Sequence, residues 1–340
     1  MKRLLFVVNS FLALCTLFLY TAAYIPPDKL GYFSGITLLT PLAIAFNFFY
    51  VLFWGIRLNK KVFLSIIILL INFTGILKFV NVNFSSVSDQ NNARIIKLMS
   101  YNTHGFRAPK TGENFHEKVL DLINIENPDI VVLQETYKNE KLEGIIKRYK
   151  NHNKLNVDNG GYSDIILTNH NIINSGLVEL HYDNAKNYAP FADIAIKKDT
   201  VRIYNLHLAS FQFSQDPEVL KNTSRKEMVK RLNKVYVHQK NQVETLKNHF
   251  SKSPYPVSIM GDFNNNAYSY IYRKFIKYGN LKDSFVEAGS GFGSSFDFSY
   301  FPTRIDFILV PEKVEVLSHK VVRTKNWSDH YPIFSEIQFN

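Results

Sequence analysis

The chain has 340 residues, of which 46% are hydrophobic, and its 40 Lys and Arg exceed its 29 Asp and Glu to give a formal net charge of +11. Its single cysteine, Cys15, excludes a framework of disulfides and leaves the redox compartment open. Residues 85–340 hold 33 basic and 28 acidic residues, a net charge of only +5. The overall basicity is therefore not in itself the mark of a nucleic-acid-binding surface.

Three apolar segments occupy the first eighty residues. Residues 4–24 carry no charge and are long enough to cross a bilayer, for which about 20 residues suffice. A second segment covers residues 32–56 and a third covers residues 62–80. All three are apolar all round, without the polar stripe of a helix that packs in a soluble domain. We therefore expect residues 1–80 to form a membrane module with about three transmembrane helices.

The first segment has a rival interpretation as a signal peptide. Met1-Lys2-Arg3 resembles a basic signal-peptide start, and Thr21-Ala22-Ala23 supplies small residues for cleavage. Its apolar core is too long for a signal peptide and further apolar segments follow, which favours a retained helix.

Basic residues predict the orientation of the module. They lie before the first segment and between the second and third, as Lys2, Arg3, Arg57, Lys60 and Lys61. The loop between the first and second segments carries only Lys29, beside Asp28. Because positive charge stays on the cytoplasmic side, the N-terminus is expected in the cytoplasm. Three spans then place the following domain outside the cytoplasm, in the periplasm if the host is Gram-negative, whereas two spans would leave it inside.

Residues 81–92, rich in Asn and Ser, are expected to be a linker, and residues 93–340 suit one large domain. In that domain five segments have the pattern of a strand and carry a polar side chain at one end. These side chains are Asn102, Glu135, His207, Asp262 and Asp306. A core strand has no packing use for a charged side chain, so the repetition indicates a functional site.

The tetrapeptide Gly261-Asp262-Phe263-Asn264 ends one of these strands. Asp262 and Asn264 are two residues apart, so on an extended strand both leave the same face while Phe263 points into the core. An acid and an amide that converge can serve as a base and as a donor to developing negative charge. The alternative is an ordinary polar turn, because Asp and Asn bond to their own backbone.

Taken in chain order, six short motifs resemble those of the endonuclease/exonuclease/phosphatase superfamily over about residues 95–340. They are Asn102, Gln134-Glu135, Asn205-x-His207, Gly261-Asp262-Phe263-Asn264, Arg304-Ile305-Asp306 and Ser328-Asp329-His330. The resemblance implies a four-layered α/β sandwich of two facing mixed sheets flanked by helices, here preceded by a transmembrane helical module. It also implies hydrolysis of phosphoester bonds with Mg²⁺ or Mn²⁺.

Carried over by this resemblance, Glu135 is the main metal ligand. Asn102 lies beside it, and both offer the hard oxygen donors that magnesium prefers. Asp329 assists the metal or its waters. Two residues after Asn102, many nucleases of the superfamily carry an acid, and this chain has His104 instead. The substitution leaves the affinity for metal and the choice of metal open.

The resemblance also implies the catalytic residues. Asp262 would orient or deprotonate the attacking water, while Asn264 and His207 would hold the non-bridging phosphate oxygens. His330 would contact the phosphate and would be oriented by Asp306.

Some of these positions have other interpretations. Asp306 could form a surface salt bridge with Arg304, and His207 could be a hydrogen-bonded core histidine. Members of the superfamily that cleave abasic DNA usually present tyrosine at His207, whereas its phosphatase, sphingomyelinase and deoxyribonuclease branches present histidine, which argues against DNA repair. Residues 160–167 resemble the family's central strand, in which Asp164 is either a surface residue or a neighbour of the site, and we leave Asp164 out of the site.

The densest remaining run of basic residues lies in residues 221–240 and has the pattern of a helix. Its basic residues are Lys221, Arg225, Lys226, Lys230, Arg231, Lys234 and Lys240. They form either a solvated helix face or a contact with anionic lipid or a polyphosphate substrate.

The expected function is therefore that of a membrane-anchored, metal-dependent phosphoesterase, which hydrolyses phosphodiester or phosphomonoester bonds by in-line attack of water. A phospholipid headgroup, nucleic acid and a small phosphodiester all remain open as substrates, so an extracytoplasmic nuclease is one alternative. A different class is a catalytically silent module that binds a phosphorylated ligand. The presence of every acid, amide and imidazole that hydrolysis needs favours the enzyme.

Overall fold

The computed structural model describes residues 2–83, 95–137, 140–152, 162–180, 187–211, 224–298 and 302–339. The chain divides into two compact units. The first unit joins Met1–Val80 with Ser210–Lys240 and Asn266–Arg273, and the second contains Asn81–Ala209, Asn241–Asn265 and Lys274–Asn340. Residues 84–92 of the predicted linker lie outside the described residues. The boundaries 1–80, 81–92 and 93–340 therefore stay a prediction.

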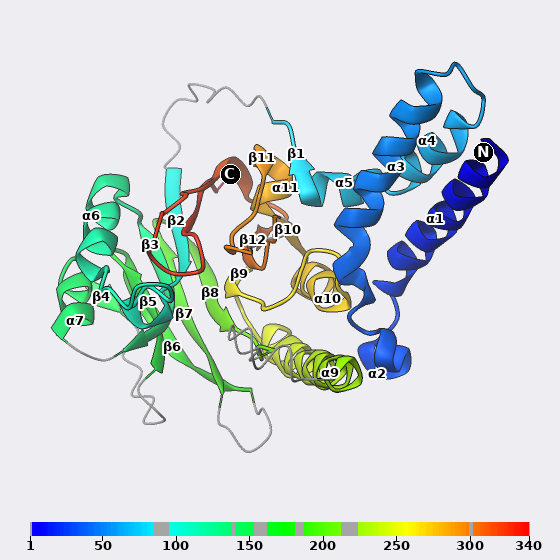
Figure 1. Cartoon of the computed structure of the whole chain (residues 1–340). Coiled ribbons are helices and arrows are strands. Elements are labelled where there is room, and N and C mark those ends of the chain that lie inside the picture. Colours follow the sequence, from blue (N-terminus) through cyan, green and yellow to red (C-terminus); the bar gives the residue numbers. More distant parts are fainter. Residues whose placement is uncertain are drawn as a thin grey trace. The chain divides into compact units, whose positions relative to one another are not determined.

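The second unit is built on two six-stranded sheets (Figure 1). The first sheet has the order β13 (Glu315–Val321), β14 (Ile333–Gln338), β2 (Ile95–Asn102), β3 (Ile130–Tyr137), β5 (Tyr162–Thr168) and β4 (Asn151–His152). The second has the order β10 (Leu281–Asp283), β12 (Asp306–Pro311), β9 (Val257–Asp262), β8 (Asp199–His207), β7 (Tyr188–Ile196) and β6 (Asn171–Glu179). Both sheets are mixed, because β2 pairs in parallel with β3, β8 pairs in parallel with β9, and the other pairs are antiparallel.

Apolar side chains from both sheets meet in the core between them. Inward-facing positions of the two sheets, such as Ile96, Leu98 and Val132 of the first and Ile203 and Met260 of the second, form one buried cluster. Because side chains alternate along a strand, the intervening positions face outward and need a second cover.

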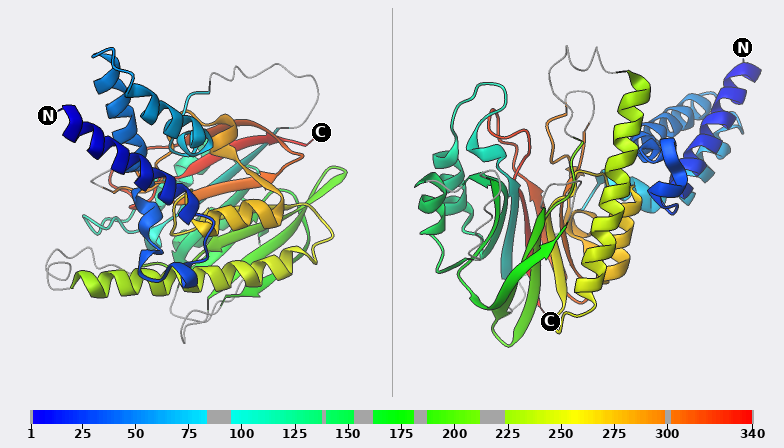
Figure 2. Two further views of the ribbon diagram at one scale, coloured as in Figure 1. Left: turned by 90° about the vertical axis from the view of Figure 1, so that its right-hand side faces the viewer. Right: turned by 90° about the horizontal axis from the view of Figure 1, so that it is seen from below.

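Helices cover the outer faces of the sheets (Figure 2). On the first sheet, α6 (His116–Glu126) and α7 (Glu140–Ile146) bury outward residues such as Tyr101 and Leu133. On the second, Phe250 at the end of α9 (Arg225–Phe250) and Phe275 in α10 (Tyr270–Gly279) belong to a chain of ring contacts that also includes Tyr204, Phe263 and Phe307. The predicted four-layered α/β sandwich is confirmed.

Four further elements are short. They are the 3-10 turn η3 (His104–Phe106), the helix α11 (Ser284–Ala288) and the two-residue strands β1 (Val80–Asn81) and β11 (Gly291–Phe292).

The first unit contains the apolar helices predicted from the sequence. They are α1 (Lys2–Ala22), α3 (Thr40–Gly55), α4 (Val62–Ile71) and α5 (Phe73–Phe79), with α2 (Pro27–Leu30), η1 (Gly31–Phe33) and η2 (Ile36–Leu39) between α1 and α3. Lys2–Ala22 and Ile36–Gly55 are each long and apolar enough to cross a membrane. The third predicted segment is not one straight helix, because α4 and α5 meet at an angle of 75° around Asn72. Together the two helices are long and apolar enough for a broken span or a re-entrant loop.

Buried polar contacts link the apolar helices. Asn47 Nδ2 in α3 donates to Thr16 Oγ1 in α1 at 2.8 Å, and Ser65 Oγ in α4 donates to Asn9 Oδ1 in α1 at 2.9 Å. Outward from these contacts the helices expose large apolar side chains, including Leu4, Phe11, Leu14, Leu52 and Leu70. Interhelical hydrogen bonds inside an apolar exterior are typical of helices that pack in a bilayer.

The turn between α1 and α3 is packed against later parts of the same unit. Lys240 Nζ in α9 lies 3.0 Å from Asp28 Oδ2 in α2, and Asn266 Nδ2 donates to the carbonyl of Thr37 at 3.2 Å. Two residues beyond Asn266, the hydroxyl of Tyr268 donates to the carbonyl of Gly75 in α5 at 2.8 Å. The segment Asn266–Arg273 thus contacts both the α1–α3 turn and α5.

Candidate active site

The register of three neighbouring strands aligns three site residues. His207 at the end of β8 lies opposite Asp262 at the end of β9, and Asp306 at the start of β12 lies opposite the same Asp262. Opposite residues of neighbouring strands point to the same face, with Cβ atoms about 5 Å apart. The three side chains continue the inward-facing rows that hold Ile203 and Met260 in the core.

Asn102, at the end of β2, links the two sheets. Its Nδ2 donates to Glu135 Oε1 in β3 at 3.1 Å and to Asp262 Oδ2 in β9 at 3.1 Å. Along β2 the inward positions change from Ile96 and Leu98 to Ser100 and Asn102, so the core becomes polar toward this end of the strand. One amide therefore brings a candidate metal ligand and the candidate base together.

Glu135 reaches this place only because β3 is irregular. Val131 and Leu133 face outward, so strict alternation would send Glu135 outward too. The pairing of β3 with β5 contains a bulge between Leu133 and Thr136, and Glu135 has a positive φ of 50°. A bulge re-aims the side chain at its position, and strained backbone at such a place is common in functional sites.

Asp164, which the sequence analysis left out, stabilises this bulge. Its Oδ1 accepts a hydrogen bond from the backbone N–H of Glu135 at 3.1 Å. Desolvation raises the pKa of Asp164 to about 6, in spite of the opposing effect of His207. The sequence did contain a signal that Asp164 faces the site. Asp164 lies two residues before the inward-facing Ile166, so the two side chains share one face of the strand.

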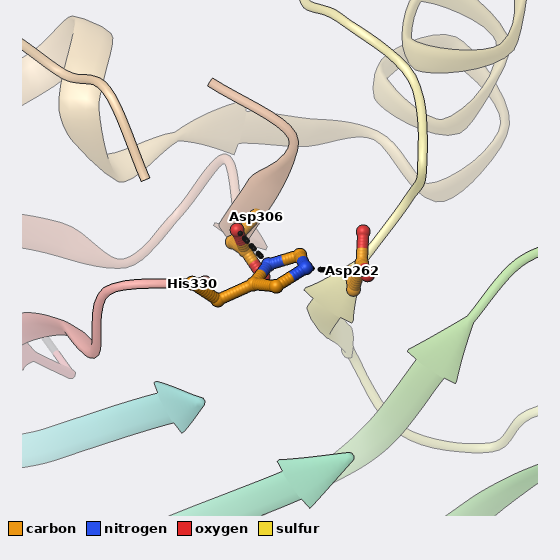
Figure 3. Close-up of side chains that lie close together, drawn as sticks. All are labelled: Asp262, Asp306 and His330. Atoms are coloured by element: carbon orange, nitrogen blue, oxygen red, sulfur yellow. Dashed lines mark hydrogen bonds and ion pairs between the residues drawn. The ribbon is translucent and has the colours of Figure 1, made fainter. Parts of the chain in front are cut away.

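His330 lies between two carboxylates (Figure 3). Its Nδ1 is 3.0 Å from Asp306 Oδ2, and its Nε2 is 3.6 Å from Asp262 Oδ2. Burial alone would lower the pKa of His330, but the charges of Asp306 and Asp262 outweigh it and raise the pKa to about 10. His330 is therefore an imidazolium at neutral pH, oriented by Asp306.

The buried position of Asp306 bears on its alternative interpretation. Asp306 is 2% exposed, and its backbone N–H donates to Ser295 Oγ at 3.0 Å. Arg304 Nη1 instead lies 2.7 Å from Asp283 Oδ2, and both of these side chains are buried. A surface salt bridge between Asp306 and Arg304 does not describe this arrangement.

Asp262 is held through both of its oxygens. Oδ1 accepts from the backbone N–H of Asn264 at 2.7 Å, while Oδ2 accepts from Asn102. The first of these bonds is that of a polar turn, so the turn and the site coincide. Burial raises the pKa of Asp262 to about 6, against the lowering effect of His330. The preceding Gly261 has φ 138°, and a Cβ there would lie 2.0 Å from the carbonyl oxygen of Leu206.

His207 is not the hydrogen-bonded core histidine of the alternative interpretation. Its Nε2 lies 3.4 Å from Glu135 Oε1 and 3.9 Å from Asp262 Oδ2, yet within the described residues this buried nitrogen has no hydrogen-bond partner. Burial would lower the pKa of His207, but the nearby carboxylates, Glu135 first among them, raise it. Asn264, by contrast, uses its side-chain Nδ2 on the carbonyl of Leu208 at 3.0 Å.

The oxygen donors fit a hard divalent cation. Glu135 offers carboxylate oxygens and Asn102 an amide oxygen, the donor types that Mg²⁺ and Mn²⁺ accept. Asn102 turns its Nδ2 to Glu135 and its Oδ1 to the backbone N–H of His104. His104 Nδ1 lies 3.7 Å from Glu135 Oε2 and 3.8 Å from Asp329 Oδ1. His104 therefore lies between Glu135 and Asp329, two of the three predicted metal ligands. Burial would raise the pKa of Glu135, but His207 and Asn102 outweigh it and lower the pKa, which keeps this candidate ligand ionised.

A second acid and histidine cluster is better suited to a proton than to a metal. Ligand atoms of Asp262, Asp306 and His330 lie within 4.8 Å of one another. However, both nitrogens of His330 face carboxylates, so the imidazolium already supplies the positive charge there. A metal ion would have to displace a strongly held proton.

Two sequence families match the chain. One, described as a domain of unknown function (DUF8431), covers residues 2–79. The other, described as the endonuclease/exonuclease/phosphatase family, covers residues 99–330. No match was found among curated proteins.

Solved structures of the same fold come from several organisms. An endonuclease/exonuclease/phosphatase family protein of Bacteroides thetaiotaomicron has a TM-score of 0.56 and 17% identity, and the match covers 73% of this chain and 99% of that one. The mannosyl-6-phosphatase Bt3783 of the same organism has a TM-score of 0.54 and 18% identity, covering 72% and 100%. TDP2 of D. rerio, complexed with a single-strand DNA product, has a TM-score of 0.52 and 15% identity, covering 72% and 98%.

At such identities the structural likeness establishes the fold alone. The sequence match, however, covers most of the chain, and it includes the strands β3, β5, β8, β9 and β12 that carry the aligned polar side chains. From the family match and the fold together, the chain belongs to the endonuclease/exonuclease/phosphatase family.

Proposed function

We propose that this protein is a membrane-anchored, divalent-metal-dependent phosphoesterase that cleaves phosphodiester or phosphomonoester bonds by in-line attack of water. The observation that carries the proposal is the position of Asp262. Its carboxylate lies within 4 Å of an amide and two imidazoles, those of Asn102, His207 and His330. A base, cationic groups and metal-type ligands therefore converge on one point, as phosphoryl transfer requires.

Glu135 and Asn102 would hold the metal ion, with Asp329 and His104 beside them. When bound there, a divalent ion neutralises charge on the phosphate and on the leaving oxygen. Two hydrogen bonds keep Glu135 in place before a ligand arrives: Asn102 Nδ2 donates to Glu135 Oε1, and the backbone N–H of Glu135 donates to Asp164 Oδ1. Such pre-orientation reduces the cost of binding and of reaching the transition state.

Asp262 would act on the attacking water. A general base works best when its pKa lies near the operating pH, and the pKa of Asp262, about 6, leaves it ionised at neutral pH while still able to accept a proton. The hydrogen bonds to its two oxygens fix the direction of its lone pairs.

The two histidines would bind the phosphate. His330, charged and oriented by Asp306, offers Nε2 toward Asp262 and the reacting group. His207 offers a buried Nε2 that has no hydrogen-bond partner among the described residues. Asn264 is the third member of the predicted phosphate-binding set, and one hydrogen of its Nδ2 is used on the carbonyl of Leu208. N–H donors aimed at non-bridging oxygens stabilise the negative charge of a phosphoryl transition state.

The contacts of the first unit support an extracytoplasmic catalytic domain. Lys61 Nζ donates to the carbonyl of Lys2 at 3.4 Å, so the N-terminus and the turn after α3 lie at one end of the helices. Asn266–Arg273 contacts both the α1–α3 turn and α5, so these two lie together as well. With the N-terminus in the cytoplasm, the end of α5 then lies outside, and the chain continues from there into the catalytic domain.

Hydrolysis by the purified full-length chain tests the proposed function. We expect turnover of bis-p-nitrophenyl phosphate or p-nitrophenyl phosphate with Mg²⁺ or Mn²⁺ and none with chelator. Asp262→Asn should lower kcat by about 100- to 10,000-fold, because it removes the base. Asp121→Asn, an equal change at an exposed position of α6, should leave the rate unchanged. Equal rates for the Asp262 variant and the wild type would contradict the assignment.

The pH profile of kcat/KM provides a separate test. Asp262 acts as a base only in its ionised form, so the rate should rise as pH increases through about 6 and then level off. It should fall again only toward pH 10, where His330 loses its proton. His330→Gln should remove the upper limit and retain the lower one. A rate that falls between pH 5 and pH 8 would exclude Asp262 as the base.

Asp164 should act through Glu135. Asp164→Ala leaves the Glu135 N–H without its acceptor, so the metal concentration for half-maximal rate should rise by about 10- to 100-fold, as for other residues that orient a metal ligand. Asp164→Asn keeps an acceptor oxygen and should recover most of the affinity. Direct Mn²⁺ titration by calorimetry separates this effect from a change in the chemical step. An unchanged Mn²⁺ affinity in Asp164→Ala would show that the bond is only structural.

The orientation can be measured by labelling single cysteines with a membrane-impermeant maleimide in spheroplasts. In a Cys15→Ser background, Tyr32→Cys in the α1–α3 turn and Lys313→Cys in the catalytic domain should react. Leu58→Cys, which is 95% exposed in the turn after α3, should react only after the membrane is permeabilised. Labelling of position 58 and protection of position 313 in intact spheroplasts would reverse the proposed topology.

A further inference from the structure

The first part of α9 has two different faces. Val235, Tyr236 and Gln239 are buried on one side, and Leu232 is half-buried beside them. Between Arg225 and Lys240 the exposed positions of the helix are all charged: Arg225, Lys226, Glu227, Lys230, Arg231 and Lys234. Five of these six are basic, and in the described part of the chain no ion pair involves Arg225, Lys226, Lys230 or Arg231. We call these six residues the basic face of α9.

The buried side of this helix packs against the turn between two candidate membrane spans. A Cβ at Gly35 would lie 3.3 Å from the ring of Tyr236 and 3.7 Å from Leu232, and Lys240 pairs with Asp28. α1 ends at Ala22 and the next candidate span begins at Ile36, so with both helices inserted in a bilayer the turn between them would lie at the level where the lipid phosphates begin. Figure 2 shows this turn against α9.

We propose that the basic face of α9 binds anionic phospholipid headgroups, so that the helix lies along the bilayer surface beside the membrane module. A helical stretch of 16 residues is about 24 Å long, enough to span several headgroups. The charges are complementary, since an anionic bilayer attracts basic residues near its surface and each one contributes about fivefold to the binding constant. A solvated helix face would require neither this excess of one sign nor this position.

Lipid is favoured over nucleic acid because of where the helix is attached. Nucleic acid would approach from bulk solvent and could bind a basic face anywhere, whereas the lipid surface is present wherever the module is inserted. The proposal rests on the proposed membrane anchoring, but it does not depend on the proposed hydrolysis.

Amide hydrogen exchange of the full-length chain in nanodiscs tests the proposal. One set of discs contains phosphatidylcholine alone and the other also contains phosphatidylglycerol. We expect backbone amides of residues 225–234 to exchange at least about threefold more slowly in the anionic discs, with the difference lost at high salt because surface charges are screened. The peptide from α1 reports insertion and should be protected in both discs.

Two charge-reversal variants with the same change in net charge separate a specific contact from general attraction. Lys226→Glu/Lys230→Glu/Arg231→Glu should abolish the lipid-dependent protection. Lys197→Glu/Lys198→Glu/Lys313→Glu, which changes exposed residues of the second unit, should retain it. A circular dichroism spectrum equal to that of the wild type checks that the first variant still folds.

Three other outcomes would contradict the proposal in different ways. Equal exchange of residues 225–234 in both discs, with α1 protected, would overturn the lipid contact while leaving the anchoring intact. Exchange of α1 in both discs would refute the anchoring, and the lipid contact with it. Protection by a single-stranded DNA oligonucleotide in neutral discs, without protection by phosphatidylglycerol, would assign the face to nucleic acid instead.

Discussion

The candidate site depends on the register of β8, β9 and β12. In that register His207, Asp262 and Asp306 stand in one row on the inward face of the second sheet. A shift of one residue in any of the pairings would turn one of these side chains to the opposite face, because side chains alternate along a strand. Gly261 helps to fix the register, since its φ of 138° and its close approach to Leu206 leave no room for a side chain. The packing of the core and the chemistry of the site are thus set by the same backbone hydrogen bonds.

Charge balance is the second constraint on the site. The carboxylates of Glu135, Asp164, Asp262 and Asp306 lie in or near the core, where unpaired charges are costly. The imidazolium of His330 offsets part of this negative charge, which explains the high pKa of His330. The pKa of His207 is raised for the same reason. The remaining negative charge surrounds Glu135 and Asn102, where a divalent cation would be favourable. A cation bound there would offset this charge, as expected of a site that serves a ligand rather than packing.

Much of this arrangement could be predicted from the sequence, and the exceptions have physical reasons. Strand-like segments with polar ends predicted Asn102, Glu135, His207, Asp262 and Asp306 as site residues, and the motifs indicated the sandwich. Strict alternation, however, would have turned Glu135 away from the site. The bulge that turns it inward could not be predicted, because a bulge depends on pairing between distant strands. For the same reason the bond from Asp164 to Glu135 was not visible. In the first unit the apolar run of residues 62–80 is interrupted at Asn72, but composition alone did not show that the chain bends by 75° there, because the size of a bend depends on backbone geometry.

The proposed membrane attachment would limit which substrates this catalytic fold meets. The solved structures are matched over nearly their whole length while about a quarter of this chain remains unmatched, so the sandwich is complete without the apolar helices. Residues that hold a phosphate and a metal do not by themselves select a substrate, because they contact only the group that all phosphoesters share. Selection of the substrate must then depend partly on where in the cell the reaction occurs. With the anchoring that we propose, the enzyme would meet substrates of the bilayer at a high effective concentration and soluble ones only as they arrive, so the same chemistry would be directed toward the membrane surface.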